Sequence, residues 1–160
     1  RYRSYLSRRS TFIERFRHPR QCGNRIGTER QSTRLKMIAD NIEVRVKTRH
    51  LPEHLPSDST QFAFAYHITI INNSNETVQL ISRYWRITDA NGKSSEVQGA
   101  GVIGKQPIIE PGESFDYTSG AVIDTPVGNM QGYYEMEQSN GGRFRVPIDV
   151  FRLAVQNILH

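Results

Sequence analysis

Cysteine, tryptophan and long apolar runs are scarce in this chain of 160 residues. Its single cysteine, Cys22, allows no internal disulfide and no cysteine-based zinc site, which fits a reducing compartment. No stretch approaches the ~20 apolar residues that a membrane helix requires. The N-terminal residues are rich in arginine but have no apolar centre, so they do not match a secretory signal. We therefore expect no membrane association.

Positive charge is confined to one end of the chain. The formal net charge is +5, a balance that by itself would suggest nucleic-acid binding. Residues 1–36 hold ten arginines and one lysine against two acids, a balance of +9. Residues 37–160 hold ten basic and fourteen acidic residues, a balance of −4. We therefore expect the folded part of the chain not to bind nucleic acid.

Residues 1–36 are predicted to be a disordered basic extension, because they combine high charge with few apolar residues. One short amphipathic helix over residues 10–17, capped by Ser10 or Thr11, is compatible with the pattern. The segment has three interpretations: a nucleic-acid arm, an organellar transit peptide, or an incidental extension upstream of a natural start at Met37. The folded domain is expected to span residues 37–160, with its first strand directly after Met37.

Beyond residue 37 the apolar residues alternate with polar ones, which is typical of half-buried strands. Strands are expected near residues 42–46, 62–71, 78–88, 96–97, 115–122, 128–137 and 143–151. Asn91-Gly92 is a strong hairpin signal, since both residues accept positive φ. Pro147 cannot donate to a ladder, so the last strand is expected at an edge or with a bulge. Trp85 is a natural core anchor.

This pattern predicts an all-β fold, namely an immunoglobulin-like or fibronectin type III-like antiparallel β-sandwich of seven to eight strands. A small barrel is the alternative. The sequence lacks the cysteine pair of antibody domains.

A glycine-rich run, Gly99-Ala100-Gly101-Val102-Ile103-Gly104, matches the G-x-G-x-x-G pattern of dinucleotide-binding folds. The helix that should follow is absent, because Pro107 and Pro111 come soon after. Three interpretations remain: a phosphate-binding loop that uses backbone amides and Lys105, a partner-binding loop, or a tight connection between strands. The candidate ligand- or partner-binding residues are Gly99, Gly101, Gly104 and Lys105.

No catalytic, metal or cofactor site is predicted. His50 and His54 are four residues apart, but the prolines around them disfavour a helix that would align them. Asp89 is expected to be a turn residue, and no Ser-His-Asp or Cys-His arrangement follows from spacing. We therefore expect a protein that is not an enzyme.

Several motifs in a fixed order resemble the ApaG family. The run from Ser82 to Asp89 followed by Asn91-Gly92 is similar to its signature strand, and so is the glycine-rich run followed by Gln106-Pro107. Further matching motifs are Pro111-Gly112-Glu113-Ser114-Phe115, Tyr117-Thr118-Ser119-Gly120, Asp124-Thr125-Pro126, Gly128-x-Met130-x-Gly132 and Phe151-Arg152-Leu153. The resemblance covers residues 37–160, and residues 1–36 have no counterpart in it.

The resemblance implies a fibronectin type III-like sandwich in a bacterial cytoplasmic protein. Similar domains in eukaryotic F-box proteins and in a polymerase-δ-interacting protein look like protein-interaction modules. The family takes its name from its place beside a diadenosine tetraphosphate hydrolase and has been linked to cobalt and magnesium tolerance, without an established catalytic residue. We therefore expect a protein-interaction module with an unknown partner, an indirect role in cobalt and magnesium homeostasis, and either a homodimer or a monomer. Binding of pyrophosphate or another phosphate-containing small molecule at residues 99–104 is the alternative.

Overall fold

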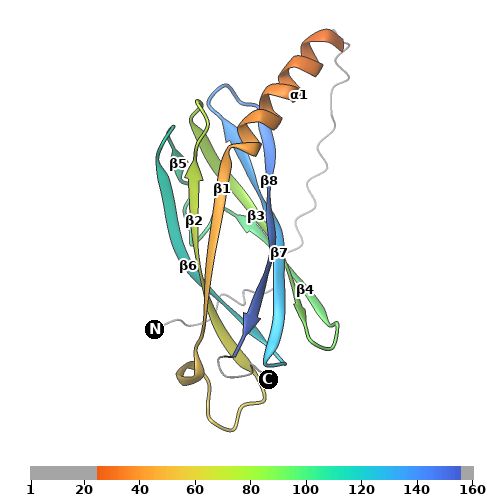
Figure 1. Ribbon diagram of the computed structural model, residues 1–160, viewed down its shortest axis with the longest axis vertical. Coiled ribbons are helices and arrows are strands. Elements are labelled where there is room, and N and C mark those ends of the chain that lie inside the picture. The colour runs from red at the N-terminus through yellow and green to blue at the C-terminus, as the bar shows by residue number, and fades with distance from the viewer. Residues whose placement is uncertain (1–24, 156–160) are drawn as a thin grey trace.

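The computed structural model describes residues 25–155, which form a two-sheet antiparallel sandwich with one helix at its end (Figure 1). One sheet has the strand order β1-β2-β6 and the other β4-β3-β7-β8, with β5 also paired to β3. The elements are α1 (Arg25–Asp40), β1 (Ile42–His50), the 3-10 helix η1 (Pro52–His54), β2 (Phe62–Asn72), β3 (Val78–Asp89), β4 (Ser94–Ala100), β5 (Ile108–Ile109), β6 (Ser114–Ile123), β7 (Val127–Gln138) and β8 (Arg143–Ala154). The predicted all-β antiparallel sandwich is confirmed.

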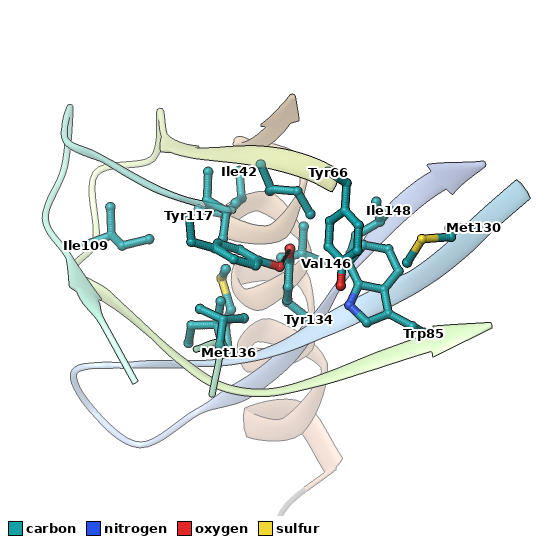
Figure 2. Packing of buried hydrophobic residues seen from close by; sticks show 14 of the residues in the cluster. Ile42, Tyr66, Trp85, Ile109, Tyr117, Met130, Tyr134, Met136, Val146 and Ile148 are labelled. Atoms are coloured by element: carbon teal, nitrogen blue, oxygen red, sulfur yellow. Dashed lines mark hydrogen bonds between the residues drawn. The ribbon is translucent and has the colours of Figure 1, made fainter. Parts of the chain in front are cut away.

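Alternation of apolar and polar residues orients each strand, because successive side chains point to opposite faces of a sheet. In β2, Phe64, Tyr66, Ile68 and Ile70 are buried, while His67 and Thr69 lie on the outer face. Between the sheets, Trp85 is 1% exposed and contacts Tyr66, Tyr134 and Phe151 edge-on, with ring centroids 5.6 to 6.1 Å apart. The predicted role of Trp85 as core anchor is confirmed (Figure 2).

Strand β8 is both an edge strand and bulged, as Pro147 predicts. Its pairing with β7 shifts between Gly132, which faces Ile148, and Met130, which faces Phe151. The extra residue changes the alternation beyond Ile148, so Val150 points outward and is 59% exposed. A bulge of this kind bends the strand and discourages pairing with another chain.

The helix α1 differs from the predicted disorder of residues 1–36, since it begins at Arg25 and continues past Met37 to Asp40. In its last turns Ile38 is buried, and Leu35 and Ala39 pack against the core. An ion pair between Arg34 and Glu76 joins the helix to the β2–β3 turn. The polar first half hides the helical period in the sequence. The helix suggested over residues 10–17, and Cys22, lie outside the described residues.

Two polar turns behave as their sequences predict. Gly92 has a φ of +81°, and Asp89 Oδ1 accepts the amides of Asn91 and Lys93 at 2.9 and 3.0 Å, so Asp89 is a turn residue. Asn72 is fully buried and its Nδ2 donates to the carbonyls of Glu76 and Ile109.

Within residues 25–155, no helix is both long and apolar enough to cross a membrane.

Candidate functional site

The edge of the five-stranded sheet is interrupted by a protruding loop. Strands β4 and β5 both pair with β3, and they are separated along it by only two of its residues: Ala100 faces Ser82, and Ile108 faces Gln79. Residues 101–107, here called the 101–107 loop, therefore leave an otherwise continuous edge and return to it. Strand β3 is also irregular there, because its pairing with β7 shifts between Leu80 and Ser82. Bulges often accompany functional sites.

The tip of the loop is a tight turn whose first central residue is an isoleucine. Val102 and Lys105 exchange backbone hydrogen bonds of 2.8 and 2.9 Å. Between them Ile103 and Gly104 have φ angles of +45° and +76°, the pattern of a type I′ turn. Such turns favour asparagine and glycine, and a β-branched residue with positive φ is an outlier. Ile103 is nevertheless 53% exposed, so burial does not offset its strain.

The base of the loop is held by both backbone and side-chain hydrogen bonds. The amide of Gly101 and the side-chain amide of Gln106 both donate to Ile81 O, at 2.8 and 2.9 Å. The Arg83 guanidinium donates to Gly101 O at 2.9 Å. Val102 is fully buried and belongs to the core. The tip is therefore displayed from a fixed base, which lowers the entropic cost of binding at it.

The predicted candidates Gly99, Gly101, Gly104 and Lys105 do lie together, and the glycines have structural reasons to be there. A Cβ on Gly99 would come within 2.9 Å of Arg83 Nη1, and one on Gly101 within 2.2 Å of Lys105 O. Gly104 occupies the second central position of the turn, where φ is positive. The G-x-G-x-x-G spacing here serves a turn between strands, without the helix of a dinucleotide-binding fold.

A phosphate at this loop would find few backbone donors. The amides of Gly101, Val102 and Lys105 already donate to carbonyls of the chain. Lys105 is exposed and remains the cationic group at the tip. The geometry therefore favours the partner-binding interpretation of the loop over the phosphate-binding one.

Three exposed apolar side chains lie at separate points along this edge. Val97 of β4 is 39% exposed, Ile103 53% and Ile108 of β5 64%. Among residues 25–155, no strand pairs with the outer side of β4, so its backbone can pair with another strand. Sequence reasoning missed Ile103 and Ile108. The available signal was an isoleucine next to a glycine in a segment expected to turn.

Arg83 links the loop to a buried group of tyrosines. The hydroxyls of Tyr117 and Tyr134 are 2.5 Å apart between the sheets (Figure 2). Burial raises the pKa of both phenols well above their ordinary value, and the nearby Arg83 only partly opposes this. Burial likewise raises the pKa of Tyr66. These tyrosines remain neutral and act in packing.

A second cluster forms on the outer face of the other sheet. His67 Nδ1 lies 2.8 Å from Thr118 Oγ1, and its Nε2 lies 3.3 Å from Asp116 Oδ2. The three residues meet only because β2 and β6 pair in register, so the sequence did not reveal them. The imidazole is 41% exposed and the carboxylate 66%, on an open strand surface. Nucleophilic catalysis needs a sheltered hydroxyl and oxyanion donors, which this surface does not provide.

The two other histidines that the structure describes, His50 and His54, do not share a metal-ligand set. His50 packs against Phe62 and Phe64, with ring centroids 6.3 and 5.4 Å away, while His54 lies in η1. Among residues 25–155, no group of three or more His, Cys, Asp or Glu side chains is arranged to hold a metal ion.

Comparison with known proteins agrees with the motifs of the chain. A family model described as the ApaG domain matches residues 52–138. The chain is 50% identical over 119 residues to Protein ApaG of Acidithiobacillus ferrooxidans, covering 74% of this chain and 94% of that protein. It is 52% identical over 117 residues to Protein ApaG of an Enterobacter species, covering 73% and 94%. A Bordetella pertussis protein of known crystal structure is 43% identical in sequence to this chain. The two structures match with a TM-score of 0.70, covering 72% of this chain and 94% of that one.

Proposed function

Since the chain belongs to the ApaG family, we propose that it is a non-enzymatic protein-interaction module that presents its 101–107 loop and the adjacent edge of β4 to a partner. The observation that carries this proposal is Ile103, which is exposed by 53% with a φ of +45°. An apolar residue that is exposed and has a strained backbone conformation contributes nothing to stability. Strain of this kind is concentrated at functional sites.

The loop and the strand edge have complementary uses in binding. Ile103 at the tip provides an exposed apolar anchor. The free side of β4 offers main-chain hydrogen bonds to an extended segment of the partner. A second copy of this chain, paired through β4, would be one such partner and would give a homodimer.

The best test is photo-crosslinking from the tip of the loop. A photo-reactive phenylalanine analogue is placed at Ile103, and at Val122 as the matched control, in the full chain expressed in bacterial cells. Val122 is 50% exposed but lies on β6 of the other sheet. We expect a defined crosslinked species from position 103 only. Equal crosslinking from both positions, or none from 103, would remove the basis of the proposal.

The proposal also includes an indirect role in cobalt and magnesium homeostasis and a cytoplasmic location. We propose that any effect on these ions passes through the partner, in keeping with the absence of a ligand set among residues 25–155. Cobalt should then broaden no localised group of amide signals. Broadening centred on a few histidines or acids would show direct binding instead.

Anion binding at the loop is the second candidate function, and Lys105 beside Gly104 is the feature that favours it. Calorimetry with pyrophosphate and with diadenosine tetraphosphate distinguishes the two candidates. The partner-binding function predicts no heat at about millimolar ligand. Saturable heat that disappears in Lys105→Ala would favour the anion site.

A further inference from the structure

A groove lies between α1 and β8, at the edge of the five-stranded sheet opposite the 101–107 loop. In Figure 1 the helix rises from the end of the sandwich beside β8. The groove has a volume of about 520 Å³, within the range of ligand sites. Leu35 and Ala39 of the helix and Phe144 and Pro147 of β8 give it an apolar floor.

The rim of the groove carries an excess of positive charge. Lys36, Arg143 and Arg145 line it, against the single carboxylate of Asp40. Arg143 already pairs with Glu137, its Nε lying 3.0 Å from Oε2. Lys36 and Arg145 are exposed and are the cations best placed for an incoming anion.

Arg145 is held in place by an aromatic stack on the outer face of the sheet. Its guanidinium lies 4.3 Å from the centroid of the Tyr133 ring, and Tyr133 stacks on Tyr84 with centroids 5.0 Å apart. A cation over an aromatic face is attracted to it, and the planar guanidinium keeps its edge donors free for a carboxylate. Because this stack restricts the Arg145 side chain, the side chain loses less conformational entropy when it binds a carboxylate.

We propose that this groove binds an acidic peptide segment of a partner protein, with one apolar side chain on the floor and carboxylates at Lys36 and Arg145. An apolar floor with a cationic rim fits a segment that carries both features. Nucleic acid or polyphosphate would contact the rim and leave the half-buried Leu35 and the exposed Pro147 uncovered. This surface is separate from the 101–107 loop, so the inference goes beyond the proposed function and does not depend on it.

The test is fluorescence anisotropy of the full chain with a labelled peptide of sequence Glu-Asp-Glu-Phe-Glu-Asp. We expect saturable binding that weakens about tenfold when the peptide phenylalanine becomes serine, since one buried aromatic side chain is worth ~1.5–3 kcal/mol. The double variant Lys36→Glu, Arg145→Glu should weaken binding about tenfold or more.

The matched control is the double variant Lys47→Glu, Arg49→Glu, which changes the net charge equally on the exposed side of β1. We expect less than about a twofold effect from it at physiological salt, where distant charges are screened. Ile103→Asn should leave peptide binding unchanged, which separates this inference from the proposed function.

A photo-reactive group at the phenylalanine position should crosslink to residues around Leu35 and Phe144. This mapping uses the unaltered chain, so it does not depend on the folding of any variant. The proposal would be overturned if both charge variants weakened binding equally, or if the serine peptide bound as tightly as the phenylalanine peptide. It would also be overturned by crosslinks elsewhere on the chain, or by tripolyphosphate competing as strongly as unlabelled peptide.

Discussion

The region around Trp85 and the 101–107 loop use apolar residues in opposite ways. Around Trp85 the large side chains are buried on regular strands and contact one another at edge-on or tilted angles. In the loop an isoleucine is exposed, on a backbone conformation that isoleucine disfavours. The packing of large apolar side chains reports the fold, whereas an exposed isoleucine in a disfavoured backbone conformation points to function.

The largest expected effect comes from the buried region. Trp85→Ala should cost about 3–5 kcal/mol of unfolding free energy, because it removes the side chain at the centre of the aromatic cluster and leaves a cavity. Denaturant unfolding followed by circular dichroism measures it. Val150→Ala, at a residue 59% exposed, should stay within about 0.5 kcal/mol. Similar losses in the two variants would contradict the assignment of the core.

Alkaline pH tests the same region through Tyr117 and Tyr134. Their pKa values are raised by burial, so the unfolded chain releases these protons near pH 10 while the folded chain keeps them. Their contribution to stability is therefore full below about pH 10 and falls above it, by ~1.4 kcal/mol per pH unit for each tyrosine. Unfolding experiments from about pH 9 to pH 11 measure the decline.

The double variant Tyr117→Phe, Tyr134→Phe is the control for the alkaline decline. It should show a shallower dependence on pH, because neither position can then titrate. An unchanged slope would mean that other groups cause the decline. Ultraviolet absorbance of tyrosinate, which should appear for these residues only on unfolding, gives an independent reading.

Gln138 lies in the buried region, but like Ile103 in the loop it is a residue that lowers stability. It is 2% exposed, and neither its Nε2 nor its Oε1 has a hydrogen-bond partner within the described residues. An unpaired buried polar group costs about 1–3 kcal/mol, so Gln138→Met should raise the unfolding free energy by about 1–2 kcal/mol. Thermal unfolding measures the change. A loss of stability would show that Gln138 is satisfied in solution, for example by water.

Strands and turns were predictable from the sequence because their signals are local. Alternation gave every strand except β5, Asn91-Gly92 gave one hairpin, and Pro147 gave an edge strand with a bulge. Each of these depends on a residue's own backbone preferences or on the period of two. The burial of Trp85 depends in addition on the bulge in β3, because Leu80 and Trp85 are both buried although a regular strand would turn them to opposite faces.

The helix and the details of the candidate site depended on long-range contacts. Leu35 and Ile38 stabilise α1 only by packing on the sandwich, so the sequence around them predicted disorder. His67 meets Asp116 and Thr118 only through the register of β2 and β6. The loop was predicted as a candidate, but turn preferences alone would not place an isoleucine at its tip.

The smallest change in stability is expected at the loop itself, and it has the opposite sign to that at Trp85. Asparagine accepts positive φ more readily than isoleucine, so Ile103→Asn should raise the unfolding free energy by about 0.5–1 kcal/mol. The same substitution removes the apolar anchor that the proposed function requires. Stability should therefore rise while partner binding falls.

The most direct test of the account measures both properties of Ile103→Asn side by side. Denaturant unfolding gives the change in stability, and recovery of the partner identified by crosslinking from position 103 gives the change in binding. The account predicts a more stable protein that recovers less than about a tenth of the partner, the loss expected when an interface anchor worth ~2 kcal/mol is removed. A less stable protein, or one that recovers the partner as well as the parent chain does, would contradict it.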